Sequence, residues 1–185
     1  MKSIRNLITL NLCLVLFSTG CLPVWTAGEV PFVPTPPEVV DRMLELAEVK
    51  KGDVVYDLGS GDGRIVIRAA KKYGTRGVGI EIDPDLVKRS QDKARDEGIG
   101  HLVEFREQDA LKVDVSSATV VTLYMLPEFN EKLRPILQQQ LRPGARVVSH
   151  DFTIGGWAPL RVEKIRGDLL HDHTIYLWRI EGEPK

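Results

Sequence analysis

A glycine-rich junction between a strand and a helix places the strongest constraint on how this chain folds. Residues 54–58 form a short apolar run typical of a buried strand, and residues 61–73 have the spacing of an amphipathic helix. The connecting sequence is Asp57-Leu58-Gly59-Ser60-Gly61-Asp62-Gly63. Glycines at such a junction let the backbone turn tightly and let a ligand approach the main chain. The junction therefore predicts an α/β fold with a ligand site where a strand ends.

The rest of the folded part alternates between strand and helix patterns. We expect further helices at 38–48, 84–97 and 128–141 and further strands at 77–82, 103–107, 119–125, 146–152, 160–165 and 174–180. The last two strands have no convincing helix between them, so we expect a terminal antiparallel pair. This order predicts the α/β class with a doubly wound sheet.

The first 21 residues have the features of a targeting segment. Lys2 and Arg5 precede a short apolar run at 7–17, and small residues then lead to Cys21. The run is short for a bilayer span, so we interpret residues 1–21 as a secretory signal peptide. The end of the segment is similar to a bacterial lipoprotein signal, in which Cys21 would be lipidated and held at a membrane. A misassigned start codon, and hence a cytoplasmic protein, is the alternative.

Residues 22–37 are expected to be an extended linker, because they contain five of the eleven prolines. The folded domain is then expected at 38–185. Both cysteines, Cys13 and Cys21, precede this domain. The domain therefore has no disulfide, no thiolate metal site and no cysteine nucleophile.

Charge and aromatic content limit the partners. The net charge is −1 and aromatic residues make up 6% of the chain, so neither a basic surplus nor a stacking surface indicates nucleic acid. His171 and His173 flank Asp172 and could share one face of a strand. No third ligand is evident, however, and we expect no metal site.

The charges around the glycine-rich loop favour a cationic ligand without phosphates. A dinucleotide-binding loop would have a third glycine where Arg64 stands and would avoid a carboxylate such as Asp57 beside a pyrophosphate. A Walker-type loop would need a lysine followed by serine or threonine. S-adenosylmethionine, with its sulfonium and α-ammonium groups, suits Asp57 better.

Acidic residues end three consecutive predicted strands: Asp57, Glu81 and Asp109. Glu81 lies 22 residues after Gly59, about the interval expected for one βαβ step. Because ligands of open α/β sheets bind beyond the carboxyl ends of the strands, the three acids should converge. Glu81 could then accept hydrogen bonds from ribose hydroxyls, and Asp109 from an adenine amino group. The alternative is three unrelated turn or cap residues.

These motifs together resemble the class I S-adenosylmethionine-dependent methyltransferases. The loop glycines Gly59, Gly61 and Gly63 match their first motif, Glu81 their acidic second-strand residue, and Asp109-Ala110 their third-strand motif. The resemblance covers nearly the whole folded part. It implies a Rossmann-like, mostly parallel seven-stranded sheet with an antiparallel last strand, and S-adenosylmethionine as cofactor.

Residues 31–35, 57–67 and 146–149 are also similar to the small mitochondrial protein-lysine methyltransferases that modify an ATP synthase subunit and the adenine nucleotide carrier, and to bacterial relatives. In that family the proline-containing segment before the first helix helps to close the cofactor site, which implies a role for Thr35. The helix usually found between strands five and six is short or missing at 153–159. The Asn/Asp-Pro-Pro-Tyr motif of many amino-group methyltransferases is absent.

The reaction itself suggests three candidate catalytic residues. Methyl transfer from a sulfonium is an in-line displacement, so the enzyme must align the nucleophile and exclude water. A lysine nucleophile must also arrive neutral, which a nearby acceptor would favour. Tyr124, His150 and Asp151 follow or end the fourth and fifth strands. The alternatives are a rim aromatic for Tyr124 and a structural hydrogen-bonded pair for the other two.

Two classes of function follow. The leading one is a methyltransferase acting on a protein lysine, with a small-molecule acceptor or, less suitably, aminopropyl transfer as variants. The other is a non-catalytic, exported lipoprotein that binds a nucleoside-like ligand, because S-adenosylmethionine is made in the cytoplasm. The residues do not indicate the oligomeric state.

Overall fold

The computed structural model describes residues 32–167 and 172–182 of the 185-residue chain. The expected targeting segment at 1–21 and most of the expected linker at 22–37 lie outside the described residues. Within the described ranges, no helix combines the length and apolar character needed to cross a bilayer.

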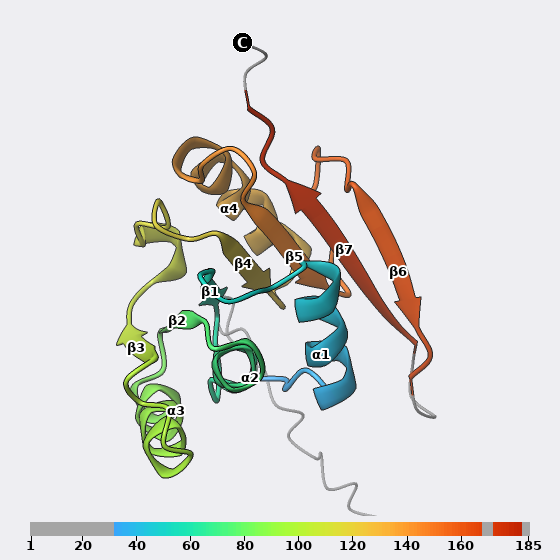
Figure 1. Ribbon diagram of the computed structural model, residues 1–185. Coiled ribbons are helices and arrows are strands. Elements are labelled where there is room, and N and C mark those ends of the chain that lie inside the picture. Colours follow the sequence, from blue (N-terminus) through green and yellow to red (C-terminus); the bar gives the residue numbers. More distant parts are fainter. Residues whose placement is uncertain (1–31, 168–171, 183–185) are drawn as a thin grey trace, which may run out of the picture.

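Seven strands form one sheet in the order β3-β2-β1-β4-β5-β7-β6 (Figure 1). The strands are β1 (Val54–Leu58), β2 (Arg76–Glu81), β3 (Val103–Glu107), β4 (Val120–Leu123), β5 (Arg146–His150), β6 (Arg161–Ile165) and β7 (His173–Arg179). The first five run parallel, whereas β7 is antiparallel to both β5 and β6. The predicted α/β sheet with an antiparallel last strand is thus confirmed.

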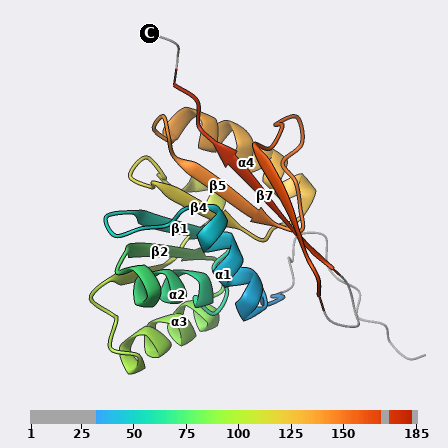
Figure 2. The same cartoon turned by 45° about the vertical axis from the view of Figure 1, so that its right-hand side comes forward.

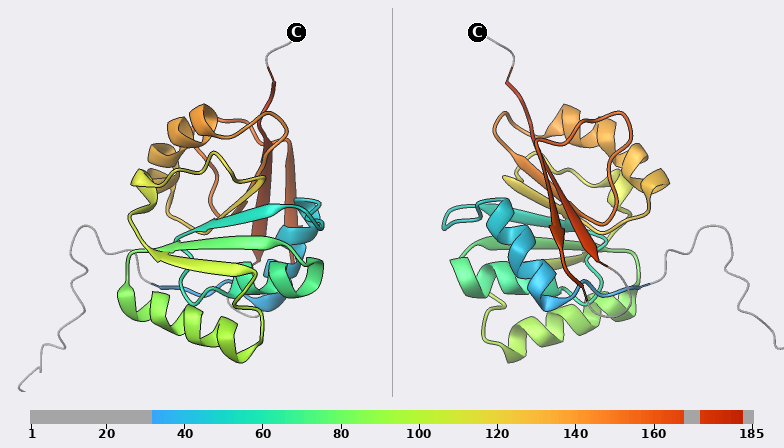
Figure 3. Two further views of the ribbon diagram at one scale, coloured as in Figure 1. Left: turned by 60° about the vertical axis from the view of Figure 1, so that its left-hand side comes forward. Right: turned by 90° about the vertical axis from the view of Figure 1, so that its right-hand side faces the viewer.

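Helices cover both faces of the sheet (Figures 2 and 3). They are α1 (Pro37–Leu46), α2 (Arg64–Tyr73), α3 (Pro84–Asp96) and α4 (Pro127–Gln140), with a 3₁₀ turn, η1 (Ala110–Lys112), after β3. The two-residue period of β1 separates two apolar clusters. Val55 packs in the cluster that contains α1 and α2, whereas Tyr56 and Leu58 pack in the cluster that contains α4.

Two of the element boundaries that differ from the expected ones have a backbone reason. The helix expected from residue 61 begins at Arg64, because Gly61 and Gly63 have φ values of 54° and 75°, which an α-helix does not accommodate. The strand expected to reach residue 152 ends at His150, because Asp151 has a φ of 57°. The turn η1 was not anticipated, since three residues are too few to show a helical period.

Residues 151–160 form turns and contain no helix, as expected. The terminal antiparallel pair also forms, with β6 lying at the edge of the sheet beside β7. Because β1 lies between β2 and β4 and runs parallel to both, the carboxyl ends of these three strands lie next to one another.

Candidate active site

The glycine-rich loop follows β1 and opens α2, as predicted. All three of its glycines have positive φ, and all three allow close contacts. A side chain at Gly59 would strike Met125, and one at Gly61 would strike the ring of Phe32. A side chain at Gly63 would strike Phe105 and Ser90, and Gly63 is also the N-cap residue of α2.

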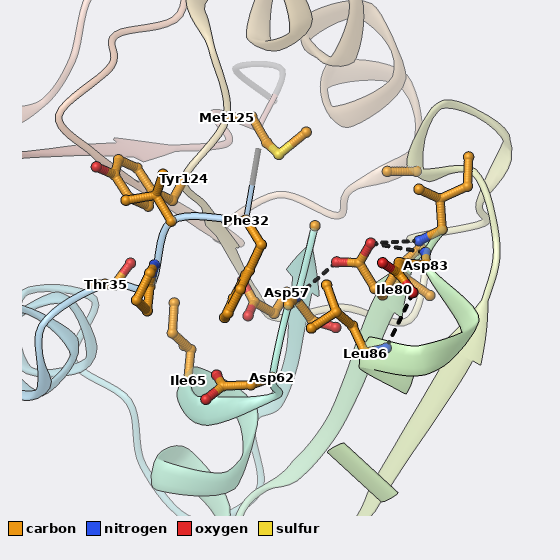
Figure 4. Close-up of a pocket in the computed structure, with 18 of the residues that line it drawn as sticks. Phe32, Thr35, Asp57, Asp62, Ile65, Ile80, Asp83, Leu86, Tyr124 and Met125 are labelled. Carbon is orange, nitrogen blue, oxygen red and sulfur yellow. Dashed lines mark hydrogen bonds between the residues drawn. The ribbon is translucent and has the colours of Figure 1, made fainter. Parts of the chain in front are cut away.

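A cavity of about 310 Å³ opens beyond the ends of β1, β2 and β4 (Figure 4). Seven of the eight predicted cofactor residues line it: Thr35, Asp57, Gly59, Gly61, Glu81, Asp109 and Ala110. The eighth, Gly63, is not among the lining residues. The volume lies at the lower end of the range of small-molecule sites.

Asp57 lies at the bottom of the cavity and is almost fully buried. One of its carboxylate oxygens accepts a hydrogen bond of 2.6 Å from the Thr122 hydroxyl. Burial raises the pKa of Asp57 to about 7, and the nearby carboxylates of Glu81 and Asp62 also raise it. A cationic group bound beside Asp57 would restore its charged form.

Backbone amides hold the carboxylate of Glu81 in place. One oxygen accepts a hydrogen bond of 2.8 Å from Gly61 N–H, and the other accepts bonds from the N–H groups of Ile82 and Asp83. Glu81 therefore joins the end of β2 to the glycine-rich loop. The oxygen that accepts from Gly61 keeps acceptor capacity for a ligand hydroxyl, whereas Ile82 and Asp83 already occupy both lone pairs of the other oxygen.

Asp109 has a structural task as well as a place in the lining. Its carboxylate accepts the Leu111 N–H at 2.9 Å and lies 3.1 Å from Lys112 Nζ. The hydrogen bond from the Leu111 N–H is the main cause of the lowered pKa of Asp109, and the bond from Lys112 is the second cause. The cap role offered as the alternative is thus present, and it keeps this carboxylate charged at the edge of the cavity.

Residues 32–35, which we call the strap, cover one side of the cavity. Figure 4 shows the Phe32 ring directed into it. Thr35 is buried and held at two points: its carbonyl accepts from Arg64 Nη1 at 2.9 Å, and its hydroxyl lies 3.2 Å from His150 Nδ1. The Arg64 guanidinium is in turn paired with Asp62.

Several residues that shape the cavity were not anticipated from the sequence. Phe32, Met125 and Phe129 supply apolar lining, and Arg64 seats the strap. Arg64 was noted only as a residue in place of a glycine. No local pattern marks such residues, because their contacts join segments that are distant in the sequence.

The three candidate catalytic residues lie in successive layers. Tyr124 lines the cavity, and the fully buried His150 ring lies behind it with ring centroids 4.0 Å apart. Asp151 lies beyond, with Oδ2 3.2 Å from His150 Nε2, and neither His150 nor Asp151 lines the cavity. Burial raises the pKa of Tyr124, and the charge of Asp151 adds to this effect. Tyr124 is thus the one candidate of the three placed to touch a ligand.

The charged groups that line the cavity are mostly acidic. They comprise five carboxylates and one guanidinium: Asp57, Asp62, Glu81, Asp83, Asp109 and Arg64. Since Arg64 is already paired with Asp62, the cavity favours cationic ligands over anionic ones.

Residues 57–161 match a family described as the ANTKMT methyltransferase domain. The chain belongs to this methyltransferase family. The matched range includes the glycine-rich loop, Glu81, Asp109 and all three candidate catalytic residues. The predicted family resemblance and the enzyme class are therefore confirmed.

Two relatives of the family show how far the similarity extends. The chain is 45% identical over 157 residues to a protein-lysine N-methyltransferase of Saccharolobus islandicus, covering 84% of this chain and 96% of that protein. It is 38% identical over 130 residues to a Xenopus laevis protein named as a lysine N-methyltransferase of an ATP synthase subunit, covering 70% of this chain. That match spans only 57% of the frog protein.

A solved structure is similar in sequence as well as in fold. It is described as an RNA methyltransferase from Salinibacter ruber in complex with S-adenosyl-L-homocysteine. The identity is 61% and the TM-score 0.76, over 83% of this chain and 97% of that one. The relatives thus share methyl transfer but differ in the acceptor that their descriptions name.

Proposed function

We propose that this methyltransferase transfers the methyl group of S-adenosylmethionine to the side-chain amine of a protein lysine. The observation that carries the proposal is the acidic cavity, which contains a buried aspartate and suits two cationic partners, the cofactor and a lysine. The near full-length similarity to the Saccharolobus protein-lysine N-methyltransferase supports the lysine acceptor.

The residues around the cavity fit the cofactor group by group. Asp57 would bind the α-ammonium, with the backbone of Gly59 and Gly61 allowing close approach. Glu81 would accept the ribose hydroxyls, and the segment Asp109-Ala110 would border the adenine. Thr35 would hold the strap over the bound molecule. Gly63, which does not line the cavity, would act only through the shape of the loop.

Tyr124 is the residue that would orient the acceptor. The amine lone pair attacks the methyl carbon while the carbon–sulfur bond breaks, and the cofactor leaves as a neutral thioether. Because the pKa of Tyr124 is raised by burial, its hydroxyl stays protonated. Its oxygen would accept an N–H hydrogen bond from the neutral amine, which leaves the nitrogen lone pair free to attack. His150 would support the Tyr124 ring from behind.

RNA is the second candidate acceptor, because the Salinibacter structure is described as an RNA methyltransferase. The net charge of −1 and the carboxylate-rich cavity favour protein over a polyanion. A small-molecule acceptor and a non-catalytic nucleoside-binding role are the remaining alternatives to the proposal.

One assay separates these candidates. The full chain is incubated with methyl-labelled S-adenosylmethionine and, separately, with soluble proteins, membrane proteins and total RNA, and Asp57→Ala serves as the inactive control. We expect label in protein that protease removes and ribonuclease does not, with mass spectrometry placing the methyl group on lysine. Label that ribonuclease removes would support RNA instead. Cofactor binding without transfer to protein or RNA would contradict the lysine proposal and would fit a small-molecule acceptor or the non-catalytic role.

We further propose that residues 1–21 direct export, on the basis of their sequence alone. The mature N-terminus, determined by mass spectrometry from the native host, tests this. Cleavage after the apolar run supports export. A lipid on Cys21 would indicate a membrane-associated lipoprotein, and an N-terminus in the linker that carries an initiator methionine would indicate a cytoplasmic protein with a later start.

A further inference from the structure

Three side chains that commonly bind metal ions meet behind Tyr124, outside the cavity. His150 ends β5, Asp151 follows it, and His173 begins the neighbouring antiparallel strand β7. Both histidines are buried, and Asp151 is partly buried. The pairing of β5 with β7 therefore brings together residues that are 23 positions apart in the sequence.

The three potential ligand atoms form a compact triangle. His150 Nε2 lies 2.9 Å from His173 Nδ1 and 3.2 Å from Asp151 Oδ2, and His173 Nδ1 lies 3.5 Å from the same oxygen. Each corner is about 1.9 Å from the centre, so an ion slightly out of the plane reaches all three atoms at the roughly 2.0–2.1 Å of zinc–nitrogen and zinc–oxygen bonds.

Neighbouring groups hold two of these side chains through their other polar atoms. His150 Nδ1 contacts the Thr35 hydroxyl at 3.2 Å, which orients Nε2 toward the centre of the triangle. Asp151 Oδ1 accepts a hydrogen bond of 2.8 Å from Thr174 N–H, which leaves Oδ2 facing the histidines. Such outer contacts are the usual way in which proteins orient metal ligands.

We propose that His150 Nε2, His173 Nδ1 and Asp151 Oδ2 form a binding site for a divalent transition metal ion. Two imidazole nitrogens and one carboxylate oxygen form a ligand set that binds Zn²⁺ and also Fe²⁺. The ion would fasten β5 to β7 and fix the His150 ring against Tyr124. It would not touch the methyl group, since neither His150 nor Asp151 lines the cavity. The proposal therefore stands independently of the proposed acceptor.

This site differs from the one considered in the sequence. The sequence places His171, Asp172 and His173 together and predicts no metal there; His171 lies outside the described residues. The antiparallel pairing instead places His173 beside His150, a contact that no local spacing indicates.

Zinc binding by the full, tag-free chain tests the proposal. The background carries Cys13→Ser and Cys21→Ser so that thiolates do not compete. After chelator treatment, we expect calorimetry to show one Zn²⁺ per chain, and we expect a higher Tm with zinc. Cobalt substitution should give the visible absorption of a low-coordinate site.

Three variants locate the ion. His173→Gln and Asp151→Asn, each kept only if circular dichroism shows a folded chain, should weaken zinc binding by at least about tenfold. The control His101→Gln changes an exposed histidine in a turn and should bind as the parent does. No zinc uptake by the folded parent, or equal uptake by the parent and both ligand variants, would overturn the proposal.

Discussion

Arg64 Nη1 donates a hydrogen bond to the backbone carbonyl of Thr35, 2.9 Å away, and so ties the start of α2 to the strap. The same guanidinium is paired with Asp62. The residue that replaces the third glycine of a dinucleotide-binding loop thus holds the cover of the cavity in place.

Replacing Arg64 should weaken cofactor binding more than it weakens folding. In Arg64→Gln the strap loses a charge-assisted bond, so we expect an affinity loss for S-adenosylmethionine of about 1–3 kcal/mol, measured by calorimetry. Arg68→Gln is the matched control, since Arg68 lies on the same helix and pairs with Asp41 away from the strap. An equal loss in both variants would mean that the effect comes from helix charge.

The affinity for S-adenosylmethionine should depend on pH through Asp57. The pKa of Asp57 in the free protein is raised to about 7, and only the charged carboxylate pairs with an ammonium group. Affinity should therefore fall as the pH drops below 7, approaching about tenfold per pH unit. Titrations across this range would show a flat profile for Asp57→Asn, and a flat profile for the parent would remove Asp57 from the ammonium site.

Glu81→Ala should weaken cofactor binding by about 1–3 kcal/mol, because ribose hydroxyls and Gly61 N–H lose their acceptor. Glu107→Ala provides the control, since Glu107 ends the adjacent strand, is exposed and does not line the cavity. Calorimetric titration of both variants measures the difference. Unchanged affinity in Glu81→Ala would place the ribose elsewhere.

Tyr124→Phe should reduce turnover while leaving cofactor affinity intact. The substitution keeps the ring against His150 and removes only the hydroxyl, so we expect kcat to fall about fivefold, equivalent to one hydrogen bond of about 1 kcal/mol. Tyr176→Phe, on β7 and outside the cavity lining, should leave kcat unchanged. A changed KM for S-adenosylmethionine with normal kcat would contradict an acceptor-orienting role for Tyr124.

The strands, the helices and the acids at the strand ends could be predicted because their signals are local. Apolar runs and helical spacing marked β1 and α2, and the topology of parallel sheets then implied that Asp57, Glu81 and Asp109 converge. The ends of elements were less accurate where the backbone takes positive φ, as at Gly63 and Asp151.

The contacts that complete the site could not be predicted in this way. The position of Thr35 depends on contacts with Arg64 and His150, which lie 29 and 115 positions away in the sequence. His150 and Asp151 were expected at the cavity because they end a strand on the correct edge. In the structure the ring of Tyr124 lies between the cavity and His150, and His150 is fully buried. Both features depend on side-chain packing, which the spacing of residues along the chain does not reveal.

Thr35 touches the cavity and also the imidazole of His150, so one side chain belongs to both the cofactor site and the histidine cluster. Occupancy of either site would then bias the position of the same hydroxyl. By thermodynamic reciprocity, an ion in the cluster and a cofactor in the cavity would change each other's affinity by the same factor. Thr35 of the strap would thereby couple the cofactor cavity to the histidine cluster allosterically.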